Sequence, residues 1–412
     1  MADWAKIKFF HNTLLGRVGS TLVATSTEST GDFDVDYLHN WLETNFWQAE
    51  DSGLTDPQYI TLDMGANLGA ELLSNAGFET GTWGDWVKDK VDGIVEFEST
   101  LVNSGTKAAR LFQGISLGTN LSQTISVTSG DVLELSLYSA GDGTNAGRYK
   151  IYDVTNSTDI VSVTSTGITG NSYSRVEKVF VVPSGCTSLR LYLYPAGVNE
   201  AVAYFDDVSL KVDTPASTSV ADYMAIIGHN LNTTEATITL QYSADNFSTD
   251  INDVFSEALS VDTAYLKEFT SPGAKRFWRL KIAGHGLVPP FISLCVWGLK
   301  TELDYATASF DPNAQSVKAN VNISQGGVVT GLHEKYTERS LALRFTDAES
   351  DICTKVKSWW EDHGIKNLFV AWETANHPTE IYLLRPDLSF NNPLTNGGLY
   401  RDISINLTGR KE

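Results

Sequence analysis

The sequence predicts a mainly β protein, and three observations lead to that prediction. Short runs in which apolar and polar residues alternate recur along the chain. Turns rich in Gly, Ser, Thr and Asn separate these runs at fairly regular spacing. Helical periodicity is confined to two segments. With 412 residues, the chain suits two to four domains of roughly 100–150 residues each.

The alternation is clearest in the middle of the chain. The runs are Thr124–Val127, Val132–Tyr138, Tyr149–Tyr152, Val176–Val182 and Leu189–Tyr194. A period of two sends successive side chains to opposite faces of a sheet. The spacing of these runs and turns predicts an antiparallel β-sandwich.

In two segments the apolar residues recur at the spacing of an α-helix. The stronger runs from Asp347 to His363, and Gly364 can end it. Its apolar residues at helical spacing are Ile352, Val356, Trp359 and Trp360. A weaker helical pattern covers Val35 to Phe46.

The charge of the chain excludes some partners. Fifty acidic residues against 30 basic ones give a formal net charge of −20. Such an excess repels phosphate, so we expect no binding to nucleic acid and none to anionic membranes. Solubility alone is an alternative reason for the charge.

The cysteines and the start of the chain bear on where the protein folds. Cys186, Cys295 and Cys353 are far apart and odd in number, which predicts buried small hydrophobic residues rather than disulfides or a zinc site. The first ten residues lack the apolar core and cleavage site of a secretory signal. No segment reaches the roughly 18 continuous apolar residues of a membrane span. We therefore expect a protein that folds in a cytoplasm without membrane insertion.

Catalytic motifs are missing from the sequence. The seven histidines are scattered and form no HExxH pattern, and there is no GxSxG elbow or P-loop. Two acids could still meet in space, as in glycoside hydrolases, but no acid stands in a recognisable catalytic context. We predict that the protein is not an enzyme.

Two separated segments resemble one known domain. The runs Tyr59–Gly65, Ala221–Leu231, Ala236–Asp245 and Lys275–Ile282 resemble strands of discoidin-like, galactose-binding-type jelly rolls. The resemblance covers 1–66 and 214–303 and implies one discontinuous β-sandwich. A domain inserted into a surface loop of such a sandwich is tolerated, because closing a longer loop costs little.

The segment between them, 67–213, has a resemblance of its own. Its opening, Glu71–Trp86, and its close, Ala203–Val212, are similar to the first and last motifs of carbohydrate-binding modules of families four and nine. Ser104–Leu111 and Leu121–Val127 resemble the strands between them. The resemblance implies a second jelly-roll β-sandwich inserted in the first.

This second resemblance also implies a structural Ca²⁺. Its ligands would include Glu79 and one of Asp206 or Asp207, and period two sends those two aspartates to opposite faces. Alternatively, Glu79 caps a turn and the aspartates alternate across a strand.

Aromatic side chains are the candidates for sugar binding, because their flat faces stack on pyranose rings. The candidates are Trp83, Trp86, Tyr138, Tyr149, Tyr192 and Tyr194, with Tyr152 beside them. Tyr192 and Tyr194 are two apart and share a face. The alternative for each is a place in the core.

The C-terminal segment, 304–412, is predicted as a small α+β domain. Arg339–Phe345 and Tyr400–Leu407 resemble small domains of tail and baseplate proteins of long-tailed phages. The resemblances together imply a virion structural protein of the tail tip or baseplate, assembled in the host cytoplasm.

Such a protein would have two kinds of partner: other tail subunits, with a homo-oligomeric ring expected, and a host-surface glycan bound by many copies at once. A capsid decoration or head-fibre protein and a secreted cellular glycan-binding accessory protein are the alternatives.

Overall fold

The computed structural model describes residues 6–389 and 391–411. Met1–Ala5, which opens the segment considered for a secretory signal and the predicted first domain, lies outside the described residues. The chain forms two compact units. Unit 1 combines residues up to 65 with 217–242 and the chain from 252 onward, and unit 2 combines 66–216 with 243–251. Both are built from antiparallel sheets, which confirms the predicted mainly β fold.

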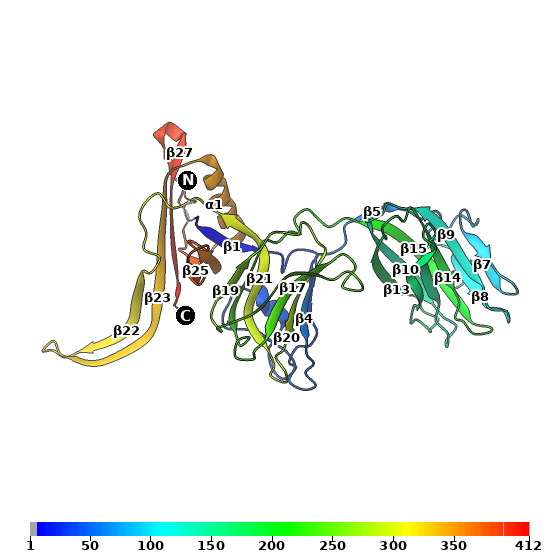
Figure 1. Ribbon diagram of the computed structural model, residues 1–412, viewed down its shortest axis with the longest axis horizontal. Helices are drawn as coiled ribbons and strands as arrows, with labels where there is room; N and C mark the ends of the chain where they lie inside the picture. The colour runs from blue at the N-terminus through cyan, green and yellow to red at the C-terminus, as the bar shows by residue number, and fades with distance from the viewer. Residues whose placement is uncertain (1–5, 390, 412) are drawn as a thin grey trace. The chain divides into compact units, whose positions relative to one another are not determined.

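Unit 2 contains two sheets, drawn in cyan and green in Figure 1. The six-stranded sheet has the order β13-β10-β15-β8-β7, with β5 also on β15; its strands are β5 (Leu68–Glu71), β7 (Ile94–Glu98), β8 (Ala108–Phe112), β10 (Val132–Ala140), β13 (Ser174–Val181) and β15 (Val202–Asp213). The five-stranded sheet has the order β12-β11-β14-β9-β6; its strands are β6 (Val87–Asp89), β9 (Asn120–Ser126), β11 (Arg148–Asp153), β12 (Thr158–Ser165) and β14 (Ser188–Tyr194).

The core of unit 2 lies between these sheets. Alternate leucines of β10 and of β14 are buried in one cluster: Leu133, Leu135, Leu137, Leu189, Leu191 and Leu193. The residues between them point away from the core, since side chains alternate along a strand. The predicted sandwich is confirmed in this part of the chain.

The two ends of the inserted segment meet at one sheet edge. β5 pairs antiparallel with β15, and the Asn67 N–H donates to the Asp213 carboxylate at 2.9 Å. Entry and exit of the chain are therefore adjacent, as an insertion into a surface loop requires.

Unit 1 also contains two sheets. The five-stranded sheet has the order β18-β17-β20-β4-β2; its strands are β2 (Thr21–Ala24), β4 (Gln58–Asp63), β17 (Thr237–Ser243), β18 (Asn252–Ala258) and β20 (Phe277–Ala283). β4 and β16 (Tyr223–His229), which flank the insertion, lie in different sheets and share a core that includes Ile60, Leu62, Met224 and Ile226.

The other sheet of unit 1 has eleven strands. Its order is β19-β16-β21-β1-β24-β25-β27-β23-β22, with β3 on β21 and β26 on β27. Besides β16, its strands are β1 (Lys8–Thr13), β3 (Trp47–Gln48), β19 (Tyr265–Glu268), β21 (Phe291–Glu302), β22 (Gln315–Ile323), β23 (Val329–Ala348), β24 (Leu368–Ala371), β25 (Ile381–Pro386), β26 (Leu394–Thr395) and β27 (Tyr400–Arg410).

Strand β1 joins the discoidin-like segments to the C-terminal segment. It pairs with β21 on one side and with β24 on the other. Its Phe9 packs edge-on against Trp359, and Phe10 packs against Tyr223 on the opposite face of the sheet. The residues from 304 onward, predicted as a domain of their own, therefore share a continuous sheet with the discoidin-like segments and belong to unit 1.

The single α-helix of the described residues is α1 (Ser350–His363). It buries the predicted face, including Ile352, Val356 and Trp359. Gly364 follows with a φ of 63° and its N–H bonds to the Trp360 carbonyl, so the predicted stop is confirmed. The helix begins at Ser350 rather than at Asp347, because Ala348 still pairs with Arg401 in the sheet and the N-cap Glu349 is extended.

The weaker helical prediction over Val35–Phe46 is wrong in length and type. The structure has a 3₁₀ turn, η1 (Val35–His39), and Trp41 then takes a φ of 63°, which ends helical geometry. A second 3₁₀ turn, η2 (Asn396–Gly398), precedes β27.

The three cysteines are free and buried, as predicted. Within 6–389 and 391–411, no helix has the length and apolar character needed to cross a membrane.

Candidate functional site

Three tyrosines lie together on the outer face of the five-stranded sheet of unit 2. Tyr152 comes from β11, and Tyr192 and Tyr194 come from β14. The alternate residues of these strands, such as Ile151 and Leu193, are fully buried in the core. The three half-buried tyrosines therefore face outward, and we call them the tyrosine platform.

The rings of the platform are close to one another. Tyr192 and Tyr194 are nearly parallel, with centroids 5.7 Å apart and an interplanar angle of 12°. Tyr152 stands edge-on to Tyr192 at 6.5 Å. Partial burial, with nearby negative charge, raises the pKa of Tyr194 to about 12, so the phenol stays neutral and keeps its O–H donor at ordinary pH.

Cationic side chains alternate with the tyrosines across the strand pair. The register sets Arg148 opposite Tyr194 and Lys150 opposite Tyr192. The Lys150 ammonium lies 4.8 Å from the Tyr152 ring centre and 5.8 Å from that of Tyr192. It also pairs with Asp159 of β12 at 2.6 Å.

Two arginines also lie beside the rings of the tyrosine platform. The Arg148 guanidinium lies 6.0 Å from the Tyr194 ring centre, and that of Arg190 lies 5.8 Å from the Tyr192 ring centre. Arg190 stands opposite Tyr152 in the register. Aromatic surface beside N–H and O–H donors can stack on a pyranose ring and hydrogen-bond its hydroxyl groups.

Of the predicted sugar-binding residues, Tyr152, Tyr192 and Tyr194 lie on this face. Tyr138 is on β10 of the other sheet, where it pairs with Arg175 and Asp206. The structure therefore separates Tyr138 from the tyrosine platform.

Trp86 and Tyr149 are core residues, which corrects their prediction as exposed stacking surfaces. Trp86 is 3% exposed, and its indole N–H donates to the Ser74 carbonyl at 3.1 Å. Tyr149 is 4% exposed, because it points inward from β11. Trp83 is half-buried and stacks on Phe97 at 4.1 Å, away from the platform.

The predicted calcium ligands gather around the loop 103–107. The Glu79 carboxylate accepts hydrogen bonds from the N–H groups of Thr106 and Lys107, and these bonds lower the pKa of Glu79. Gly105 has a φ of 65°, and a Cβ there would lie 2.3 Å from a Glu79 oxygen. This supports the alternative in which Glu79 caps a turn.

Both aspartates contact the same loop, so the expectation that they point to opposite faces is wrong. Buried Asp206 accepts from the Asn103 N–H at 2.8 Å, and Asp207 accepts from the Ser104 hydroxyl at 2.9 Å. A φ of 46° at Asp207 interrupts the alternation of the strand. Burial raises the pKa of Asp206.

Calcium binding by these carboxylates stays a prediction. Within the described part of the chain, no group of three or more His, Cys, Asp and Glu side chains is arranged to hold a metal. Ca²⁺ needs six to eight oxygens, whereas Glu79, Asp206 and Asp207 already accept hydrogen bonds from loop 103–107.

The cations of this face were not among the residues predicted from the sequence. Arg148, Lys150 and Arg190 stand at the outward positions of the same alternating runs that supplied the tyrosines. The alternation could have placed them outward, but only the register of β11 on β14 shows that they border the tyrosines.

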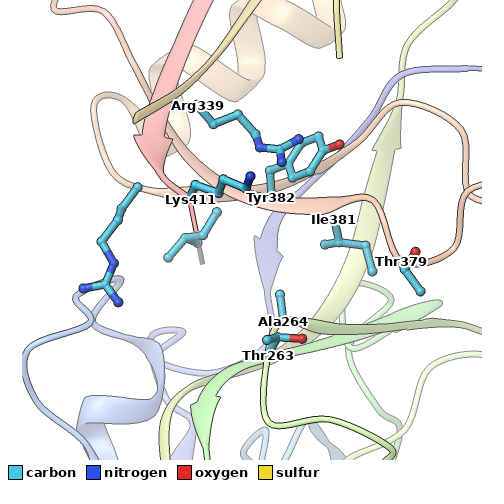
Figure 2. Close-up of a pocket in the computed structure, with 9 residues that line it drawn as sticks. Thr263, Ala264, Arg339, Thr379, Ile381, Tyr382 and Lys411 are labelled. Atoms are coloured by element: carbon cyan, nitrogen blue, oxygen red, sulfur yellow. The ribbon is translucent and has the colours of Figure 1, made fainter. Parts of the chain in front are cut away.

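Unit 1 has a separate small hollow of about 150 Å³. Figure 2 shows Arg339, Tyr382 and Lys411 around it, and the Arg339 guanidinium lies 3.9 Å from the Tyr382 ring centre. The hollow is smaller than the roughly 300–1,000 Å³ of typical ligand pockets. It is therefore a poor match for an oligosaccharide.

No protein family and no curated protein matches the sequence. Solved structures match parts of the fold. A tandem of two CBM22 domains from Paenibacillus barcinonensis Xyn10C is 11% identical over 57% of this chain and 99% of its own, with a TM-score of 0.31. A CBM61 module in complex with β-1,4-galactotriose is 18% identical over 34% of this chain and 98% of its own, with a TM-score of 0.28.

A phage protein is also among the similar structures. The enzymatically active domain of tailspike protein 4 of bacteriophage CBA120 is 15% identical over 34% of this chain, with a TM-score of 0.30. The present chain spans 21% of that domain's length. Likeness at this level carries no argument about what this chain binds.

Proposed function

We propose that this protein is a glycan-binding protein that uses the outer face of the five-stranded sheet of unit 2. The observation that supports it best is the tyrosine platform, where Tyr192 and Tyr194 lie parallel on an exposed sheet face. Weak single sites would gain strength from many copies on one particle.

The test is a glycan array probed with the labelled full chain. Tyr192→Ala and Tyr194→Ala should each weaken binding by about tenfold, since a stacking ring contributes roughly 1.4 kcal/mol. Tyr138→Ala is the matched control, because it removes an outward tyrosine from the other sheet. If all three substitutions weaken binding equally, or if none of them does, the tyrosine platform is not the glycan-binding site.

We further propose that copies of this chain assemble through the hairpin of β22 and β23. In Figure 1 this hairpin extends away from the rest of unit 1. Val321 pairs directly with Leu332, and Ile323 with Val329. Val321 is 49% and Leu332 70% exposed, so one face of a two-stranded ribbon is apolar and uncovered. An isolated hairpin of this kind is marginal in water.

A second copy of the chain is the occupant that fits this apolar face. β22 and β19 are the two edge strands of the eleven-stranded sheet. Beside β19 is a groove of about 640 Å³ whose lining includes Leu259, Val261, Leu266, Pro378 and Ile381. A hairpin on one copy and a groove at the opposite edge of the next make a head-to-tail contact, which closes into a ring if the rotation allows.

Sedimentation of the full chain tests this contact. We expect an oligomer that Leu332→Glu shifts to monomer, whereas Val23→Glu, which charges an exposed valine of β2, leaves it unchanged. A wild-type monomer at every concentration would end the assembly proposal and leave glycan binding unaffected.

The location that best combines glycan binding with assembly is the tail tip or baseplate of a phage particle. An antibody against 70–213 should label the tail in negative-stain images of particles that contain the protein. Label on the head would assign it to capsid decoration. Particles without label would favour a secreted glycan-binding protein instead.

A further inference from the structure

The sheet face that carries the tyrosine platform is basic, although the chain as a whole is acidic. The chain has a net charge of −20, yet Arg148, Lys150 and Arg190 all point outward from two neighbouring strands. Lys150 is paired with Asp159. Within the described residues, neither arginine forms an ion pair with a carboxylate.

Arg148 is held in place without a counter-ion. Its Nε donates to the Pro195 carbonyl at 3.0 Å. Gly197 leaves the room that the guanidinium needs, because a Cβ there would lie 2.9 Å from a terminal nitrogen. Burial lowers the pKa of Arg148. A partly buried cation without a partner is costly, and an anion placed beside it would offset that cost.

Arg190 is anchored in the same way. Its Nε donates to the Thr124 hydroxyl at 2.7 Å, and one terminal nitrogen donates weakly to the Tyr192 hydroxyl at 3.4 Å. Each guanidinium is thus fixed through Nε, and both side chains are half-buried on the outer face of the sheet. A fixed planar fork is the arrangement that binds carboxylate, sulfate and phosphate groups best.

We propose that the tyrosine platform binds an anionic glycan, whose sugar rings contact the tyrosines while its acidic groups bind Arg148 and Arg190; this rests on the proposed function. The register sets Arg148 opposite Tyr194, and Tyr194 is four residues from Arg190. The two arginines are therefore roughly 13 Å apart along the strands. This spacing between the two backbone positions suits a polymer with repeated acidic groups, which can contact both arginines along its length.

Paired polymers with the same backbone test the charge alone. Calorimetry with the full chain compares polygalacturonate with its methyl ester, and dextran sulfate with dextran. We expect one acidic polymer to bind at least about tenfold tighter than its neutral partner. Preference for polygalacturonate identifies carboxylate groups, and preference for dextran sulfate identifies sulfate groups.

Substitutions separate specific recognition from general attraction. The double variant Arg148→Gln/Arg190→Gln should lose the tenfold preference, and Arg148→Lys/Arg190→Lys should recover it in part, because lysine keeps the charge but not the fork. Arg175→Gln, on β13 of the other sheet, is the control and should leave the preference intact. Each variant is first checked for an unchanged melting temperature.

Two results would overturn the inference in distinguishable ways. If acidic and neutral polymers bind equally and only Tyr192→Ala weakens binding, the platform remains a glycan site without anion preference. If neither Tyr192→Ala nor the arginine variants change binding, the proposed function fails together with the inference.

Discussion

Tyr149 and Tyr152 have different roles although they lie three residues apart on one strand. An odd separation places them on opposite faces of β11, so Tyr149 packs in the core and Tyr152 joins the platform. The same contrast separates Trp86, which is buried, from its exposed neighbour Val87. Residue type alone did not distinguish these roles.

Trp86→Ala tests this assignment. Removing a buried indole should cost about 3–5 kcal/mol of unfolding free energy, measured by urea denaturation. Val87→Ala, at an exposed position, should change it by less than roughly 0.5 kcal/mol. If the Trp86→Ala protein is as stable as the wild type but no longer binds glycan, Trp86 is a binding residue and not a core residue.

Two buried histidines of unit 1 make stability depend on pH. His11 and His363 are 5.4 Å apart between ring centres, and His363 also contacts Trp41 edge-on. Burial and their mutual repulsion lower the pKa of His11 to about 3, and burial lowers that of His363 to about 4. Both rings therefore stay neutral in the folded protein at ordinary pH.

Acid should therefore destabilise unit 1. Unfolded histidine has a pKa of about 6.5, so below that pH the unfolded state binds more protons than the folded state. Stability is full above pH of about 6.5 and should fall by on the order of a few kcal/mol toward pH 4.

Urea denaturation between pH 7 and 4 measures this slope. His11→Gln should make it shallower, whereas His333→Gln, at an exposed position of β23, should not. Identical slopes for all three proteins would show that the buried histidines do not control the acid response.

At the scale of elements, loop 103–107 links two distant parts of unit 2. Glu79 lies within the first motif of the insert, and Asp206 and Asp207 lie in β15. Their carboxylates accept from the main chain and side chains of the loop. The resemblance to carbohydrate-binding modules implied a metal at this point, whereas the structure shows hydrogen bonds.

Calcium should therefore have little effect on the melting of unit 2. We expect the same melting temperature, by calorimetry, with EDTA and with excess Ca²⁺. Asp206→Asn is the companion variant, and it should destabilise unit 2 under both conditions because it weakens bonds to the N–H groups of Asn103 and Ser104. A melting temperature that rises with calcium and no longer does so in Asp206→Asn would restore the metal site.

At the scale of the whole molecule, unit 2 has the properties of an independent domain. It has its own core between two sheets, and β5 and β15 hold its two ends together. We therefore expect residues 66–216, produced alone, to unfold in one cooperative transition and to bind glycan like the full chain. A fragment without a cooperative transition would show that unit 2 depends on unit 1.

Much of the fold followed from local pattern. The runs at 132–138, 149–152 and 189–194 became β10, β11 and β14, and the helix before Gly364 formed where its spacing indicated. These features depend on periodicity and chain geometry, which are visible in the sequence.

The sequence by itself determined that Tyr192 and Tyr194 share a face, because residues two apart in a strand always do. Only the tertiary structure decided that this face is the outer one, that Arg148 stands beside Tyr194, and that β1 joins the C-terminal strands to the sandwich. Those choices depend on which distant strands pair and in which register, since a shift of one residue would turn every side chain to the other face.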